Sequence, residues 1–277
     1  MNFSRRSLLA VCLAVPALAL GPQPAMAAAA LPTVDMEAVL KAAQWDPAKA
    51  DSAVTPGAGP SVKLVETALR KKGLLDPAYE DGHFGTRTVT AYAQWQQQLG
   101  YSGLDATGLP GRTSLTRLGE GQFTLTRIVL AGAKVTHQGF PVNDRTLAML
   151  KAAQGRSGRT YVVEQGSYSP GTDPTSAGTH DGGGVLDLDA EALTAAQRTA
   201  AVTALRQVGF AAWLRTPAQG DWPLHIHAVA ISDPDLSSPA QKQVGAYYEG
   251  RNGLANNAAD DGPRVPKVTY EEYLRTL

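Results

Sequence analysis

The hydrophobic pattern of the chain changes its period near residue 120, and this change restricts what the chain can fold into. Before it, apolar residues recur at helical spacing over 61–72 and 86–99. After it, short alternating runs typical of strands accompany two further helical patterns. Because strands and helices are segregated rather than strictly alternating, the sequence predicts an α+β fold. We expect a helical unit followed by a unit with a mainly antiparallel sheet.

The first unit is predicted to be a module of three helices at residues 61–119. Its third helix is expected over 113–118, and Ser61 is a suitable N-cap for the first. The preceding segment, 28–60, is expected to contain a short helix over 34–44 and then a linker rich in Ala, Pro and Gly.

The second unit is predicted to occupy residues 123–233. Residues 234–277 are polar and dotted with glycine, so we expect an irregular C-terminal tail that closes with a helix near 270–277. Within the second unit, strands are expected at 123–129, 160–164, 185–189, 210–214 and 225–231, and helices at 144–154 and 194–208.

The N-terminus has the pattern of a cleavable secretory signal over residues 1–27. A basic start is followed by a short apolar run and an Ala-Met-Ala cleavage site. The pair Arg5-Arg6 followed by two leucines resembles a twin-arginine signal. No other segment has the roughly 20 consecutive apolar residues that a membrane-spanning helix needs. We therefore expect a secreted or cell-wall protein.

Charge and cysteine content exclude some partners and some kinds of site. The chain has 25 basic and 25 acidic residues, so it lacks the excess of positive charge that nucleic-acid binding requires. The single cysteine, Cys12, lies inside the predicted signal, so the mature protein should contain no disulfide. Any metal site must then be built from His and carboxylate side chains.

Residues suited to metal binding gather in two short stretches of the second unit. His180 precedes a glycine-rich turn, and Asp187 lies in the strand that follows. His225 and His227 share one face of the last strand, because successive side chains of a strand alternate between its faces. His180, Asp187 and one of the two late histidines are three nitrogen and oxygen ligands, the number typical of a catalytic zinc site that keeps a position for water.

This pattern, H-x-x-G-x-x-x-D followed by H-x-H, resembles that of the D-alanyl-D-alanine carboxypeptidase family of zinc peptidases, which shares its fold with the hedgehog signalling domain. The resemblance implies that Zn²⁺ is bound by His180, Asp187 and His227. It also implies that Asp221 is the general base and that His225 orients water or stabilises the oxyanion.

Two further residues are candidates for substrate binding. Tyr168 stands in Gln-Gly-Ser-Tyr-Ser, where the family often has an arginine. Arg215 follows an apolar strand and is a candidate for holding a substrate carboxylate, with a solvated strand end as the alternative.

The helical module resembles the bacterial peptidoglycan-binding domain found beside wall hydrolases. The motifs are Asp81-Gly82-His83-Phe84-Gly85 between the first two helices, an aromatic-Gln pair at Trp95-Gln96, and Gly111-Arg112-Thr113 at the third helix. Together, the two resemblances imply an exported zinc metallopeptidase that hydrolyses peptide bonds of peptidoglycan stems, as a carboxypeptidase or an endopeptidase. The alternative is a non-catalytic peptidoglycan-binding or scaffolding protein with a structural zinc site.

Overall fold

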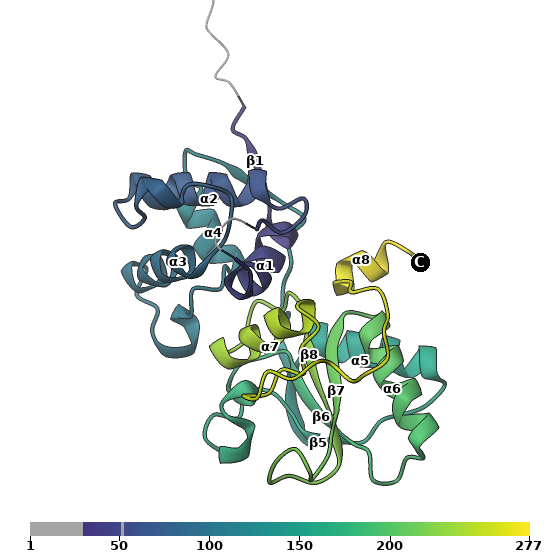
Figure 1. Cartoon of the computed structure of the whole chain (residues 1–277). Coiled ribbons are helices and arrows are strands. Elements are labelled where there is room, and N and C mark those ends of the chain that lie inside the picture. Colours follow the sequence, from purple (N-terminus) through teal and green to yellow (C-terminus); the bar gives the residue numbers. More distant parts are fainter. Residues whose placement is uncertain (1–29, 51–52) are drawn as a thin grey trace, which may run out of the picture. The chain divides into compact units, whose positions relative to one another are not determined.

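The computed structural model describes residues 30–50 and 53–277 (Figure 1). The predicted signal peptide and Cys12 lie outside the described residues. Leu31–Leu277 form one compact unit with an α+β fold, in which a helical N-terminal region is followed by mainly antiparallel sheets with helices, as expected. Among the helices that the structure describes, none is long and apolar enough to cross a membrane.

The N-terminal region contains four α-helices at the places where helical periodicity predicted them. Asp35 caps the first helix by accepting a hydrogen bond from the Ala38 amide. A short parallel pair joins β1 (Thr33–Asp35) to β2 (Thr124–Thr126), so the strand expected at 123–129 lies outside the main sheet. The helices are α1 (Met36–Trp45), α2 (Gly59–Lys71), α3 (Thr86–Gln98) and α4 (Arg112–Leu118), with 3₁₀ turns at Asp46–Ala48, Pro77–Tyr79 and Gly103–Ala106.

The segment that was expected to be a linker begins at Asp46, whose carboxylate is buried in the protein interior. Asp46 is fully buried, and its side chain accepts hydrogen bonds from the Phe84 amide at 3.0 Å and the Thr55 hydroxyl at 2.6 Å. These bonds hold the segment against the turn before α3. The described part of this segment is therefore tied to the helical region.

A four-stranded antiparallel sheet forms the centre of the C-terminal region. Its order is β5-β6-β8-β7, and a separate hairpin of β3 and β4 precedes α5. The sequence analysis missed this hairpin because its two strands are only four residues each. The bounds are β3 (Lys134–His137), β4 (Phe140–Asn143), α5 (Asp144–Ser157), β5 (Val163–Gln165), β6 (Val185–Asp189), α6 (Ala195–Gln207), β7 (Phe210–Arg215) and β8 (His225–Ala230), with 3₁₀ turns at Pro174–Ser176 and Thr179–Asp181.

The two faces of this sheet have different roles. Leu186, Phe210 and Ile226 belong to a core that also contains buried residues of α5 and α6. Val185 and Trp213 project to the other face and belong to the core shared with the N-terminal helices. Because side chains alternate along each strand, Asp187 and His227 also lie on this second face.

The tail that was expected to be irregular contains a helix, α7 (Ser238–Tyr248). Ser237 caps it by accepting a hydrogen bond from the Ala240 amide. Its Val244 and Tyr247 are buried. The expectation was wrong here because the apolar stripe of α7 is short. The closing helix was confirmed as α8 (Tyr270–Leu274).

Candidate metal centre

Three of the residues singled out in the sequence come together at the polar end of the second sheet face. His180 lies in the 3₁₀ turn Thr179–Asp181, Asp187 on β6 and His227 on β8, where the register places the latter two opposite each other. The glycines after His180 are required by close packing, since a Cβ on Gly182 would overlap with the carbonyl of Asp235. The turn can therefore bring His180 back over β6.

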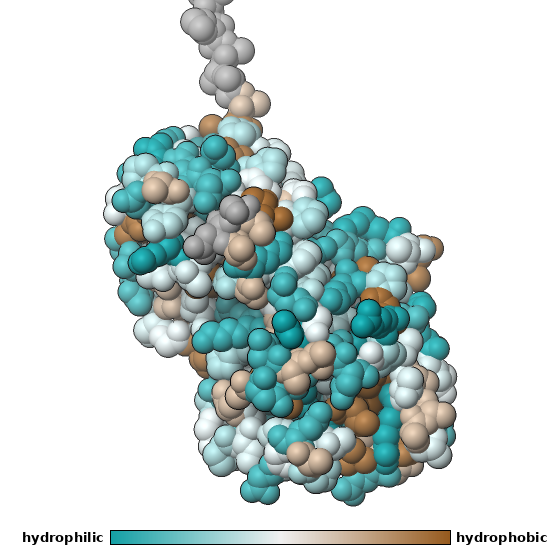
Figure 2. Space-filling view, viewed as in Figure 1, coloured by the Kyte–Doolittle hydropathy of each residue, from teal (hydrophilic) through white to brown (hydrophobic). Residues whose placement is uncertain are grey.

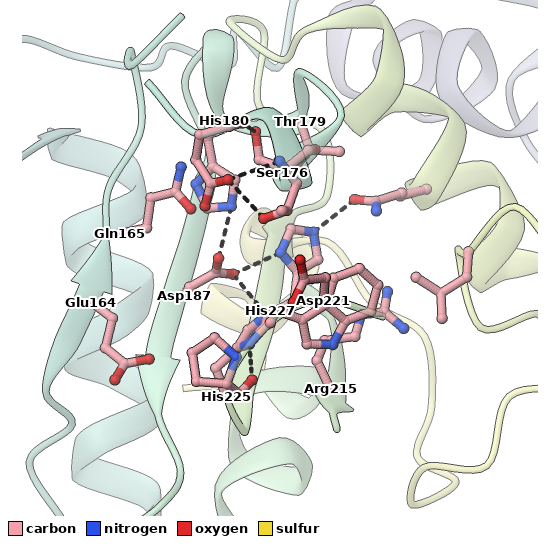
Figure 3. Close-up of a pocket in the computed structure, with 16 residues that line it drawn as sticks. Glu164, Gln165, Ser176, Thr179, His180, Asp187, Arg215, Asp221, His225 and His227 are labelled. Atoms are coloured by element: carbon pink, nitrogen blue, oxygen red, sulfur yellow. Dashed lines mark hydrogen bonds and ion pairs between the residues drawn. The ribbon is translucent and has the colours of Figure 1, made fainter. Parts of the chain in front are cut away.

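Asp187 lies between the two imidazoles (Figure 3). Its Oδ2 is 3.2 Å from Nε2 of His180, and its Oδ1 is 2.7 Å from Nδ1 of His227. One ligand atom from each residue lies within 4.8 Å of the other two. Both histidines are buried, whereas Asp187 is partly exposed. This group can hold a metal ion.

Hydrogen bonds to the outer ring nitrogens orient both histidines. Nδ1 of His180 is 2.8 Å from the carbonyl of Gly166, and Nε2 of His227 is 2.8 Å from Oε1 of Gln243. The Gln243 amide nitrogen donates to the carbonyl of Gly253, which fixes the amide orientation. Because the partner oxygens only accept, the outer nitrogens carry the protons. In the neutral rings, the inner nitrogens that face Asp187 then carry lone pairs that can bind a metal ion.

The inner nitrogen of His180 supports this interpretation most directly. Its Nε2 is buried and, apart from the 3.2 Å contact with Oδ2 of Asp187, which lacks hydrogen-bond geometry, it has no polar partner among the described residues. A buried polar atom without a partner is costly, so such atoms in a folded protein point to a function. Two imidazole nitrogens and a carboxylate form a donor set that suits a divalent ion and leaves further coordination positions for other ligands.

The electrostatics of the group keep the carboxylate ionised. Burial opposes the charged form of Asp187, but His180 and His227 outweigh it and hold its pKa well below the usual range. Burial likewise opposes the charged form of His180, yet Asp187 and the Gly166 carbonyl raise its pKa. Burial lowers the pKa of His227. The site therefore offers a negative charge and, through His227, a neutral imidazole.

The three residues line a cavity of about 470 Å³ that also contains three other predicted site residues. His225 is buried, and its Nε2 is 3.8 Å from Oδ1 of Asp187. Nδ1 of His225 lies 2.8 Å from the carbonyl of Pro223. Asp221 is exposed on the turn between β7 and β8 and also lines the cavity.

Arg215, the third of these residues, is not the solvated strand end that was considered as an alternative. It is buried, with 3% of its surface exposed, and Nη1 donates to the carbonyl of Asn252 at 2.8 Å. Its guanidinium lies 4.9 Å from the ring centroid of Trp213. Burial lowers the pKa of Arg215 to about 10, so it remains charged near neutral pH.

Tyr168 is the predicted site residue that the structure does not bring to this cavity. Its hydroxyl donates to Asp235 at 2.6 Å and accepts from the Asn143 amide at 3.2 Å. It lines a different cavity, of about 940 Å³. The positive φ of 55° at Tyr168 turns the chain at this point.

Sequence reasoning missed two glutamines of the cavity. Gln243 comes from α7, and no motif near it indicated a role. Gln165 ends β5 opposite Asp187, and its Nε2 is buried with no partner among the described residues. Alternation along β5 would have placed Gln165 on the same face as Val163, toward the core with α5 and α6. A register shift between these two residues instead pairs Gln165 with Asp187 on the other face.

Comparisons of the chain with protein-family models, curated proteins and solved structures find no match.

Proposed function

We propose that this protein is an exported zinc metallopeptidase that hydrolyses peptide bonds in peptidoglycan stem peptides. The observation that carries the proposal is the convergence of His180, Asp187 and His227, with their free ligand atoms facing one another, in an open cavity. Three nitrogen and oxygen ligands beside a cavity are typical of catalytic rather than structural zinc.

Zinc bound by this group would supply a water of lowered pKa and would polarise the carbonyl of the scissile amide. The residues of the chain would carry out the proton transfers. Asp221 would accept a proton from the attacking water and deliver it to the leaving amine as the C–N bond breaks. His225 lies beside Asp187, and its Nδ1 faces the Pro223 carbonyl, so its Nε2 would accept a hydrogen bond from the attacking water and orient it.

The choice of peptidoglycan as substrate is supported by the motifs of the helical region. Its resemblance to peptidoglycan-binding domains and the export signal both indicate the cell wall. A module that binds the polymer would raise the local concentration of stem peptides without changing the site itself. On the face drawn in Figure 2, hydrophobic residues occur in small groups among hydrophilic ones, which suits a polar polymer.

The test is to measure zinc content and the release of amino acids or stem fragments from purified sacculi. The mature protein should contain one equivalent of zinc and release fragments. His180→Ala should lose both properties, whereas His137→Ala, on β3 and outside the cavity, should retain both. A folded mature protein that takes up no zinc would contradict the proposal.

The alternative, a wall-binding protein with structural zinc, is favoured by the exposed position of Asp221, because a general base acts best when it is held in place. Asp221→Ala separates the two. If Asp221 is the base, this variant should lower hydrolysis by about 10²–10⁴-fold, with zinc content and sacculus binding unchanged. Zinc binding without hydrolysis by the unaltered protein would support the alternative.

A further inference from the structure

Three arginines are deeply buried in the part of the chain that the structure describes, and one of them lacks a carboxylate partner. Arg145 donates to both oxygens of Glu271, and Arg206 donates to Asp260 at 2.8 Å. Among the described residues, no carboxylate lies within ion-pair distance of Arg215, and its Nη2 is buried without any hydrogen-bond partner. Burying a charge without a counter-ion is expensive. Arg215 is also the one of the three that lines the cavity beside the metal-binding group.

The surroundings of Arg215 hold its guanidinium in place. Nη1 is bonded to the Asn252 carbonyl, and the planar group lies over the ring of Trp213. The turn at Gly253 packs against both groups, since a Cβ added there would be 3.2 Å from the Trp213 ring and 3.5 Å from Nη2 of Arg215. A guanidinium that is held rigidly is suited to binding a carboxylate, because little freedom is lost when the ligand arrives.

Arg215 also lies at a suitable place relative to the candidate metal centre. It ends β7, where it is paired with His225 of β8, the strand that also carries His227. Adjacent strands lie about 4.8 Å apart, and consecutive Cα atoms of a peptide are about 3.8 Å apart. Because it is opposite His225, Arg215 is diagonal to His227, about 7–8 Å away, so its long side chain can reach a carboxylate one residue beyond a carbonyl held at the metal-binding group.

We propose that Arg215 binds the free α-carboxylate of the residue that follows the scissile bond. The site would then remove a single C-terminal residue and would disfavour peptides that continue beyond it. This proposal rests on the proposed function, because the position of the scissile bond is defined by the metal-binding group.

The end of the cavity next to β5, on the other side of Asp187 from Arg215, has no free cationic side chain among its residues labelled in Figure 3, Glu164 and Gln165. Glu164 lines it, and Gln165 of β5 has its buried amide nitrogen unpartnered among the described residues. The Glu164 carboxylate would repel a carboxylate, whereas the Gln165 amide would donate to a backbone carbonyl of the substrate. In Figure 3, Glu164 and Gln165 lie on one side of Asp187 and Arg215 on the other. The guanidinium of Arg215 on one side and the amide of Gln165 on the other would orient the substrate, with its carboxyl end toward β7 (Figure 3).

The experiment compares two peptides ending in D-Ala-D-Ala that differ only at the C-terminus, one a carboxylate and one a carboxamide. Calorimetry measures their binding to the metal-free protein, and kcat/KM is measured for the zinc-loaded protein. We expect the acid to be preferred at least about tenfold, as a charge-assisted bidentate contact allows. Arg215→Met should abolish the preference by weakening the acid alone, and Arg215→Lys should retain part of it. Arg159→Met, at an exposed arginine, is the matched control.

Each outcome decides a different point. Equal binding of acid and amide by the unaltered protein would overturn the proposal, and this comparison needs no variant that must fold. If only a third peptide, an amide with a carboxylate in its side chain, showed an Arg215-dependent gain, the assignment to the α-carboxylate would be wrong. Acid-selective binding without any hydrolysis would support the role of Arg215 and would overturn the proposed enzyme function.

Discussion

At the scale of single residues, the candidate centre depends on which nitrogen of each histidine is left free. His180 uses Nδ1 and His227 uses Nε2 for hydrogen bonds to acceptor oxygens, so the two rings offer different nitrogens toward Asp187. One of these acceptors is the backbone carbonyl of Gly166, which no amino-acid substitution removes. The other is the side chain of Gln243, which can be tested by mutation.

Gln243→Leu should weaken zinc binding by about 10–100-fold, because the ring of His227 loses the acceptor that orients it. Gln243→Glu, which keeps an acceptor oxygen, should restore most of the affinity. Competition with a chelator measures the dissociation constant, and Lys242→Leu, at the exposed neighbouring position, is the control. An unchanged affinity in Gln243→Leu would show that Gly166 and packing alone orient the site.

At the scale of elements, a buried carboxyl group joins α2 to α3 and to the turn before it. Glu66 accepts hydrogen bonds from the Gly82 amide at 2.8 Å and from the Thr88 hydroxyl at 3.0 Å. Burial raises the pKa of Glu66 to about 8, against an unfolded value of 4.5. The folded state therefore keeps a proton that the unfolded state loses, and the resulting stability is complete below about pH 4.5 and is lost as pH rises through 8.

Glu66→Gln should remove this pH dependence, because the amide stays neutral and can still accept from Gly82. Relative to the unaltered protein, the variant should gain free energy of unfolding between pH 5 and 9, by an amount that grows with pH. Urea unfolding at several pH values measures this difference, with Glu120→Gln at an exposed position as the control. Parallel curves for the two proteins would show that Glu66 is ionised in the folded state.

Helical and strand periodicity predicted most elements, since α1 to α6 and the four strands of the main sheet lie at or near the expected positions. The missed elements are short. The hairpin of β3 and β4 and the helix α7 have too few apolar residues for a period to be recognised. Packing against distant segments stabilises such short elements. In α7, for example, Val244 and Tyr247 are buried.

At the scale of the whole molecule, α7 connects the candidate metal centre to the N-terminal helices. Trp45 of α1 stacks on Tyr248 of α7 with centroids 4.4 Å apart, and the side chain of Gln44 accepts from the Ser232 amide at 2.9 Å. Gly245 permits this close approach, because a Cβ there would be 2.8 Å from the Gln44 carbonyl.

Gly245→Val should therefore destabilise the protein by about 1–3 kcal/mol, the usual cost of overpacking. Because α7 also carries Gln243, we expect zinc affinity to fall together with the melting temperature. Thermal unfolding followed by tryptophan fluorescence measures the shift. Gly155→Val, in α5 where an added Cβ meets nothing within 4 Å, is the control. A normal melting temperature for Gly245→Val would show that α1 and α7 separate readily.

The sequence by itself determined the residue types of the candidate centre and their faces. Strand alternation places Asp187 on one side of β6 and His225 with His227 on one side of β8. This information is local, because it follows from the period of a strand. The tertiary structure alone decided which residues complete the site. Gln243 of α7 lies within hydrogen-bond distance of His227, and Arg215 is buried. Tyr168 instead donates a hydrogen bond to Asp235 in another cavity. These outcomes depend on contacts between segments far apart in the chain, and a local period carries no information about them.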